Sequence, residues 1–295
     1  MIERRSFSRM LFRIANVIFL IFLALCCLIP FTHVLFASVS SPTFLSQNRG
    51  LVLYPHGFSL NGYDLVFRNP NLIPSYFNTI FYVVMGTLLN LLMTSVAAYV
   101  LSRKGPMLNK FFMKLITFTM FFGGGIVPFF LVVDGLGMTD TRLSQLIPYA
   151  VSTYNIIIMR TSFQQVPVSL EESARIDGAN DFTILFRIIM PLSKAVLAVI
   201  TLFVAVSFWN SWFPSVLFLR DRSLFPLQLI LREILINNDV SKVVPVRELS
   251  ASQEQYYRKL VKYCIIVVAT LPIVCIYPFL QKYFVKGVMI GSIKE

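Results

Sequence analysis

Between Ser169 and Pro191, the sequence places a carboxylate and several helix-capping side chains in a polar stretch bordered by apolar runs. Ser169 is followed three residues later by Glu172, the spacing of a capping box, in which each side chain accepts a hydrogen bond from the other residue's backbone N–H. Gly178 suits the end of that helix, and Asn180 with Asp181 suits the cap of a second one. The stretch therefore predicts two short helices joined by a bend at Gly178, the second of which runs into Pro191.

Beyond this stretch, the sequence offers no residue set for catalysis and no metal ligands. A phosphate-binding GxxxxGK[S/T] motif is absent from the sequence. The long apolar runs, which are candidate membrane spans, contain no Asp or Glu that could relay protons within a membrane. The cysteines lie in apolar runs and the histidines are isolated: Cys26, Cys27, Cys264, Cys275, His33 and His56. We therefore expect no catalytic residue, metal or cofactor in this chain. If the protein carries out an energy-driven process, another subunit must supply the energy.

The polar stretch resembles the cytoplasmic loop motif of importer-type ABC transporter permeases. That motif reads Glu-Ala-Ala, three residues, Gly, nine residues, Ile, one residue and Leu-Pro. Here it falls on Glu172, Ser173, Ala174, Gly178, Ile188, Met190 and Pro191. Ser173 replaces Ala and Met190 replaces Leu, and both changes are small or conserve volume. The resemblance implies that the loop docks into a cleft on a cytoplasmic ATP-hydrolysing subunit, which binds the ATP and Mg²⁺.

The motif residues also have plain structural interpretations. As a cap, Glu172 would stabilise its helix by about 1 kcal/mol. As a charge buried in a partner's cleft, its loss would cost several times as much. Gly178 either ends a helix or allows two backbones to approach closely. Ala174 shares a helix face with Leu170 and Gly178, and such a stripe fits a shallow groove.

The composition is that of a membrane protein. The chain has 295 residues, of which 56% are hydrophobic and only 14% charged, and its mean hydropathy is +0.72. Soluble domains average roughly 25% charged residues. The net charge of +12 is explained by basic residues beside the cytoplasmic ends of spans. Because no basic, aromatic-laced soluble module is present, we expect contact with membrane lipid and none with nucleic acid.

Long apolar runs predict an all-α membrane protein with six transmembrane helices in a single domain, residues 1–295. The first of these runs is long enough to span the roughly 30 Å of hydrocarbon. The predicted spans are about 14–39, 76–101, 111–133, 143–159, 195–213 and 263–284. Basic residues near the first two cytoplasmic segments place both termini in the cytoplasm. Residues 161–194 are then the cytoplasmic docking loop, and residues 218–260 form an external loop.

Two of these predicted spans contain residues unusual for a membrane helix. Gly123-Gly124-Gly125 and Pro128 interrupt the third span, which predicts either a hinge beside the transport pathway or a tightly packed or terminal segment. The fourth span is polar and includes Asn155. Because polar groups in hydrocarbon usually face other helices or water, Asn155 is a candidate for the pathway.

The sequence SFWNSWFP near the outer end of the fifth span supplies three further candidates. Trp209 and Trp212 flank Asn210. Indole rings stack on sugar faces, but they also anchor helices at the membrane interface. Both interpretations stay open for these three residues.

Other features resemble the carbohydrate-uptake importers within this family. Residues 218–260 resemble the external loop that reaches into the solute-binding protein of maltose-type importers. Gly291 to Lys294 resemble the tail with which the second permease of that transporter contacts its ATPases. WNSWFP and the C-terminal YPFLQKYFVKGVMIGSIKE are most similar to permeases for complex oligosaccharides such as alginate or aldouronate fragments.

The resemblance implies the type I ABC importer permease fold in the bacterial cytoplasmic (inner) membrane. It implies import of an oligosaccharide or sugar derivative. The implied partners are a homologous second permease, two cytoplasmic ATP-binding subunits and an extracellular or periplasmic solute-binding protein. The docking motif does not exclude an importer of amino acids or peptides. A secondary transporter or channel would need ionisable groups within spans or inverted repeats, and an intramembrane enzyme would need paired acids or metal ligands.

Overall fold

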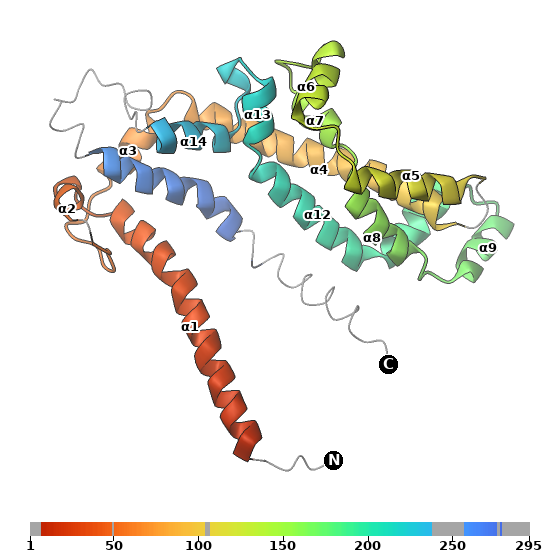
Figure 1. Ribbon diagram of the computed structural model, residues 1–295, viewed down its shortest axis with the longest axis horizontal. Coiled ribbons are helices and arrows are strands. Elements are labelled where there is room, and N and C mark those ends of the chain that lie inside the picture. The colour runs from red at the N-terminus through yellow and green to blue at the C-terminus, as the bar shows by residue number, and fades with distance from the viewer. Residues whose placement is uncertain (1–6, 49, 104–106, 238–256, 276–277, 279–295) are drawn as a thin grey trace. The chain divides into compact units, whose positions relative to one another are not determined.

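A computed structural model describes residues 7–48, 50–103, 107–237, 257–275 and 278, and these residues form helices and turns without a β-strand among them (Figure 1). The α-helices are α1 (Phe7–Ser38), α2 (Pro42–Gln47), α3 (Asn61–Phe67), α4 (Leu72–Ser102), α5 (Asn109–Phe121), α6 (Ile126–Gly135), α7 (Leu143–Leu146), α8 (Thr153–Phe163), α9 (Val168–Ile176), α10 (Asp181–Ile184), α11 (Met190–Leu192), α12 (Lys194–Trp209), α13 (Phe213–Phe218) and α14 (Leu227–Asn237). Short 3₁₀ segments, η1 (Ile147–Tyr149) and η3 (Arg222–Leu224), and a π-helix, η2 (Leu185–Ile189), join them. Residues 257–275 are also helical. The all-α prediction is confirmed for the described residues.

The chain divides into two compact units. One unit comprises Met1–Pro70 with Glu233–Leu271, and the other comprises Asn71–Arg232 with Pro272–Glu295. The docking loop and the Asn155 and Trp209–Trp212 candidates all belong to the second unit. This second unit therefore carries the site.

The first unit contains α1 and a folded segment that follows it. Helix α1 has 32 residues, about 48 Å at 1.5 Å per residue, and its apolar side chains are exposed along most of its length. Exposed apolar residues all around a helix are expected where lipid, not water, surrounds it. The Cys264 thiol donates a hydrogen bond to the Ser38 carbonyl at 3.3 Å, which joins residues 257–275 to the end of α1.

Both histidines have structural roles in this first unit. The His33 Nδ1 atom accepts a hydrogen bond from the Val52 N–H at 2.9 Å. The His56 ring stacks on Phe44 at 4.1 Å and lies 4.2 Å from the ring of Tyr54. These contacts fold the segment after α1 into ordered turns.

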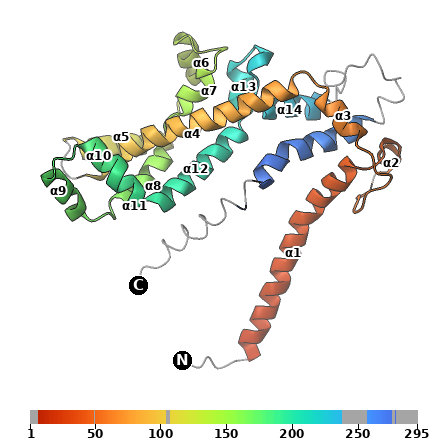
Figure 2. The ribbon, with the colours of Figure 1, turned by 180° about the vertical axis from the view of Figure 1, so that it is seen from behind.

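Helix α4 is the element around which the second unit is built. Figures 1 and 2 show α8 and α12 running beside it, and both contact it. Gly86 on α4 makes the approach to α12 close, because a Cβ atom there would lie 2.4 Å from Cζ of Phe208. No side chain larger than hydrogen fits at Gly86 without moving the Phe208 ring.

The buried face of α4 is polar and its exposed face is apolar. Eight buried polar residues recur at helical spacing: Ser75, Asn78, Thr79, Thr87, Asn90, Thr94, Ser95 and Ser102. Large apolar residues of the same helix, such as Phe77 and Leu88, are exposed. This pattern is the reverse of a soluble protein and is expected when lipid covers the outer face, since polar groups then turn toward neighbouring helices.

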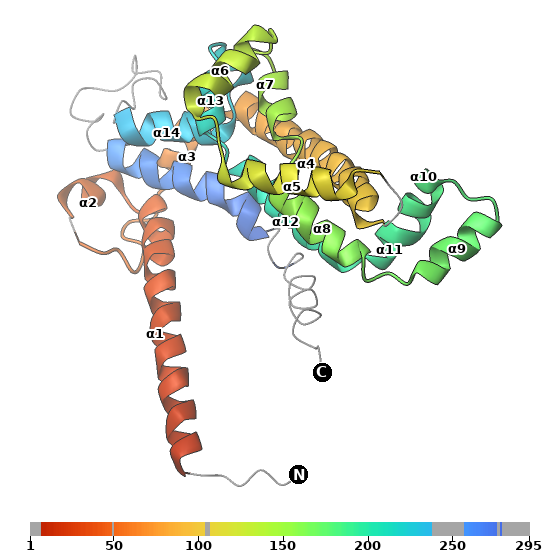
Figure 3. The ribbon, with the colours of Figure 1, turned by 45° about the vertical axis from the view of Figure 1, so that its right-hand side comes forward.

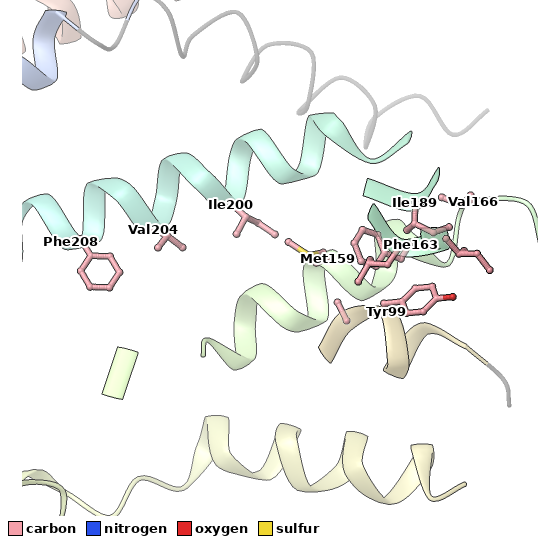
Figure 4. Packing of buried hydrophobic residues seen from close by; sticks show 11 residues of the cluster. Tyr99, Met159, Phe163, Val166, Ile189, Ile200, Val204 and Phe208 are labelled. Atoms are coloured by element: carbon pink, nitrogen blue, oxygen red, sulfur yellow. The ribbon is translucent and has the colours of Figure 1, made fainter. Parts of the chain in front are cut away.

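A hydrophobic cluster closes the end of the second unit at which α4 terminates. It joins α4, α8, α10, η2 and α12, and Figure 4 shows Tyr99, Phe163, Val166 and Ile189 converging there. Phe163, Ile184 and Ile189 are completely buried. The docking loop is therefore attached to the helix bundle by a packed core.

Helices α5 and α6 replace the predicted third span with a bent pair. The two axes meet at 117°, and α5 with 13 residues is about 20 Å long, short of a membrane thickness. The break at Gly123–Gly125 agrees with the predicted interruption, and Gly125 has φ +84. Tight packing is not its cause, since a Cβ at Gly123 or Gly125 would meet no atom of the described residues within 4 Å.

Candidate functional site

The first helix of the docking loop, α9, begins earlier than the sequence predicts. Its N-cap is Pro167, whose carbonyl accepts the first hydrogen bond from Leu170 N–H at 3.2 Å. Ser169 therefore lies inside the first turn, and no side-chain cap is formed. The predicted capping box of Ser169 with Glu172 is wrong, because α9 begins at Val168, which places Ser169 inside the helix and not at its N-cap.

The bend after α9 is confirmed at Gly178. Gly178 has φ +84, and its N–H donates to the Arg175 carbonyl at 3.0 Å while Ala179 N–H donates to the Ala174 carbonyl at 2.9 Å. This pair of hydrogen bonds is a Schellman motif, which glycine favours because it has no Cβ. Thus Ala174 and Gly178 of the motif act together to end α9.

The second helix begins at the predicted cap. The Asn180 side chain accepts a hydrogen bond from Thr183 N–H at 2.8 Å. Helix α10 then passes through the π-helix η2 and α11 before an 88° bend leads into α12. Ile188 packs against the hydrophobic cluster, whereas Pro191 is exposed.

Both helices of the loop carry exposed side chains. Figure 3 shows α9 and α10 extending beyond the end of α4. Glu172, Ser173 and Gly178 are exposed. Ile176 and Phe182 are also exposed, at 86% and 66%, although they are apolar. Neither side chain is predicted from the sequence. Ile176 has a signal, since it is an apolar residue at the end of the polar helix α9, whereas Phe182 stands in an apolar run and has none.

The residue before Glu172 is the buried acid of this loop. The Glu171 carboxylate forms an ion pair with Arg103, the C-cap of α4, at 2.6 Å between Oε1 and Nη2. The two side chains are 6% and 16% exposed. Burial raises the pKa of Glu171, and the charge of Arg103 offsets part of that rise.

A second polar contact lies beside this ion pair. The Tyr99 hydroxyl donates to Asp181 at 3.2 Å, and the Arg103 guanidinium lies 4.9 Å from the centre of the Tyr99 ring. Asp181 also pairs with Arg175. This connection of α4 to the docking loop through Arg103 is not predicted from the sequence.

A cavity of about 590 Å³ lies elsewhere in the second unit and brings together three of the four predicted pathway residues. Asn155, Asn210 and Trp212 line it. Trp209 does not, because its side chain is buried with its ring 6.5 Å from that of Tyr76. Trp209 therefore does not line this cavity, and its contact with substrate stays a prediction.

The cavity wall combines neutral hydrogen-bonding groups with aromatic rings. The lining residues are Asn90, Tyr149, Val151, Ser152, Tyr154, Asn155, Phe203, Val204, Ser207, Phe208, Asn210, Ser211, Trp212, Phe213 and Pro214. None of these is charged, although the Arg232 guanidinium lies 3.8 Å from the centre of the Trp212 ring. Amides and hydroxyls among aromatic rings suit a ligand with many hydroxyl groups and apolar faces.

Several predicted elements lie outside the described residues. They are Gly291 and Lys294 of the C-terminal tail, residues 238–256 of the external loop, and the part of the final predicted span that follows residue 275, apart from residue 278. Among the described residues, no group of three or more His, Cys, Asp or Glu side chains is placed to hold a metal ion.

The family described as the binding-protein-dependent transport system inner membrane component matches residues 91–290, a range that includes both the docking loop and most of the cavity. The chain belongs to this family. Two helical segments, Met10–Ser38 and Leu72–Ser102, are long and apolar enough to cross a membrane, and two bent pairs qualify if each pair is taken as one span.

Relatives with known names cover almost the whole chain. The polygalacturonan/rhamnogalacturonan transport system permease protein YtcP of Bacillus subtilis is 38% identical over 94% of this chain and 96% of its own length. Protein LplC of the same organism is 37% identical over 96% of this chain and 95% of its own length. A chain from the crystal structure of a bacterial ABC transporter involved in the import of the acidic polysaccharide alginate is 35% identical, covers 95% of this chain and 99% of its own, and has a TM-score of 0.86.

These findings confirm the resemblance drawn from the docking motif. The chain is a permease subunit of an ABC importer with the type I permease fold, not an enzyme. Permeases of this family work in general with a partner permease, ATPase subunits and a solute-binding protein.

Proposed function

We propose that this permease subunit moves an oligosaccharide or sugar derivative across the bacterial cytoplasmic membrane. The observation that carries the proposal is the docking loop: an exposed α9 held by a Schellman bend and a buried core at the end of α4. Such a loop can receive force from outside the chain and pass it to the helices that form the cavity.

Six crossings with both termini in the cytoplasm remain our topology. The crossings are α1, α4, the α5–α6 pair, the segment from α7 through α8, α12, and the helix that begins at residue 257. The breaks in the third and fourth crossings are tolerable because neighbouring helices can satisfy the freed backbone groups. Asn90 on α4 supports this, since its amide donates to the Tyr149 carbonyl at 3.0 Å beside one of the breaks.

The proposed partners are a homologous second permease, two cytoplasmic ATPases that bind ATP and Mg²⁺, and an external solute-binding protein. Glu172, Ser173 and Gly178 would enter the cleft of one ATPase, with Ile176 and Phe182 supplying apolar contact. Their exposure in the isolated chain leaves these side chains available for that contact, which supports this arrangement.

The cavity favours a sugar over an amino acid or peptide as the transported solute. Amino acids and peptides carry an ammonium group, which acidic and neutral sugars lack and which is recognised by a carboxylate. The described residues lining this cavity are uncharged, whereas rings such as Trp212 can stack on sugar faces. The names of the relatives, which refer to polysaccharides and oligosaccharides, point the same way.

The proposal can be tested on the assembled transporter in liposomes. We expect uptake of acidic or neutral oligosaccharides that depends on ATP and the solute-binding protein, and no uptake of peptides of similar size. Glu172→Ala should reduce both assembly with the ATPases and substrate-stimulated ATP hydrolysis. The matched control is Asp64→Asn, which neutralises an exposed acid of the Arg68–Asp64 pair in the first unit. Uptake of peptides alone would contradict the sugar class, and undiminished assembly of Glu172→Ala would contradict the docking role.

A further inference from the structure

Helix α4 makes specific polar contacts at three separate levels of the second unit. Near its C-terminal end, Arg103 pairs with Glu171 of α9. In its middle, Asn90 lines the cavity. Near its N-terminal end, side chains of α4 bind the backbone of residues 223–227. With 31 residues, α4 spans about 46 Å, so one helix reaches all three levels.

The contacts near the N-terminal end bind a loop by its backbone. The Asn78 amide donates to the Ser223 carbonyl at 2.6 Å and to the Phe225 carbonyl at 3.2 Å. The Tyr82 hydroxyl donates to the Leu224 carbonyl at 2.8 Å. Thr79 accepts a hydrogen bond from Leu227 N–H at 2.8 Å. Residues 223–227 belong to the start of the predicted external loop, so α4 holds the base of that loop.

The contact near the C-terminal end is an ion pair whose two side chains are largely buried. Removing one member of such a pair leaves the other charge buried and uncompensated, and this is more costly than losing an exposed pair. Arg103 is further fixed by the neighbouring Tyr99 ring. The carbonyl of Leu101 accepts a hydrogen bond from Arg160 Nε at 2.8 Å, so the end of α4 is also tied to α8.

From these contacts we propose that Arg103 and Glu171 are positioning residues that make α9 and α4 move as one body. We call this pair the Arg103–Glu171 latch. Through it, displacement of the docking loop reaches the cavity wall at Asn90 and the base of the external loop at residues 223–227. This proposal rests on the proposed function of the docking loop in ATP-driven import.

A second route runs through the chain itself, because the docking loop continues into α12 across the 88° bend. That route passes a π-helix and a sharp change of direction, and π-helical turns often mark sites that deform. The two routes make different predictions, since breaking the latch leaves the covalent route through α12 intact.

The test compares coupling in wild-type transporter with Arg103→Met, Glu171→Gln and the charge-swapped double variant Arg103→Glu/Glu171→Arg. The readouts are transport per ATP hydrolysed and the ratio of substrate-stimulated to basal hydrolysis, each per assembled complex. We expect each single variant to lower the ratio by about tenfold, the size of effect known for coupling networks. The swapped variant should recover part of it, while Asp64→Asn should match the wild type. Unchanged ratios in both single variants would overturn the proposal.

A cross-linking experiment covers the case in which the single variants fail to fold. With Cys26, Cys27, Cys264 and Cys275 replaced, Arg103→Cys and Glu171→Cys are joined by a bifunctional thiol reagent. If α9 and α4 move as one body, the cross-linked transporter should keep at least half of its uptake rate. Complete arrest of uptake, reversed by cleaving the reagent, would show that they move apart and would overturn the proposal. Failure of the proposed function is distinguishable, because wild-type transporter would then show neither uptake nor substrate-stimulated hydrolysis.

Discussion

The docking loop and the cavity are built in different ways. The bend between α9 and α10 is made by contacts between residues at most six positions apart, such as Ala174 with Ala179 and Arg175 with Asp181. The cavity is lined by residues from α4, η1, the turn before α8, the start of α8, and the segment from α12 to α13. A mutation at the bend should therefore change stability locally, whereas a mutation in the helix packing should act on the whole cavity.

The largest effect is expected where α4 meets α12. Gly86→Leu places a side chain where Phe208 lies, since even a Cβ would be 2.4 Å from that ring. Overpacking of this kind costs about 1–3 kcal/mol, and Phe208 also lines the cavity. We expect a lower unfolding temperature in detergent and weaker uptake. The matched control is Gly135→Ala on α6, where a Cβ would meet no described atom within 4 Å; equal effects at both sites would contradict close packing as the cause.

A smaller effect is expected within the cavity wall. Trp212→Ala removes an aromatic face and its contact with Arg232, and the loss of about 1 kcal/mol corresponds to about fivefold weaker binding. Uptake should show a higher apparent KM for the oligosaccharide, with unchanged assembly with the ATPases. Trp209→Phe is the comparison, since Trp209 is buried outside the lining. If Trp209→Phe raised the KM as much as Trp212→Ala did, the assignment of the wall would be wrong.

A local effect is expected at the start of α10. Asn180→Ala removes the cap on Thr183 N–H, which costs about 1 kcal/mol. Hydrogen exchange of the Thr183 amide should accelerate about fivefold, while amides of α4 keep their wild-type rates. Acceleration throughout the second unit would mean that the loop is not an independent local structure.

The smallest effect is expected at Ser169. Because Pro167 rather than Ser169 starts α9, Ser169→Ala should change stability by no more than about 0.5 kcal/mol, as at ordinary surface sites. Hydrogen exchange in the first turn of α9 measures this directly. A change of about 1 kcal/mol would restore the capping box that the sequence predicts.

The sequence predicts those parts of the site that depend on neighbours along the chain. Gly178 predicts the bend because glycine is preferred just after the end of a helix. Asn180 predicts the second cap because asparagine is preferred at a helix N-cap. The start of α9 was misplaced since Ser169 and Glu172 match a capping box, but Pro167 begins the helix first. Composition and the docking motif together predict the fold class and the family, which the comparisons confirm.

The remaining parts depend on contacts between residues far apart in the sequence. Nothing near Arg103 indicates that Glu171 would neutralise it, and nothing near Trp209 distinguishes its buried indole from the half-buried Trp212 that lines the cavity. The buried polar face of α4 is likewise hidden from hydropathy, because Asn78, Thr79 and Asn90 are spaced within a long apolar run. Only tertiary packing decides which of these groups face a neighbour.

The most direct test of the account asks on which side of the membrane the docking loop lies and whether an ATPase covers it. A cysteine replaces the exposed Ile176 in a chain without its native cysteines, and a membrane-impermeant thiol reagent is applied. We predict no labelling in intact cells, labelling in inverted membrane vesicles lacking the ATPases, and protection when the cognate ATPases are added back. Labelling from outside intact cells would contradict the account, as would unchanged labelling of the vesicles in the presence of the ATPases.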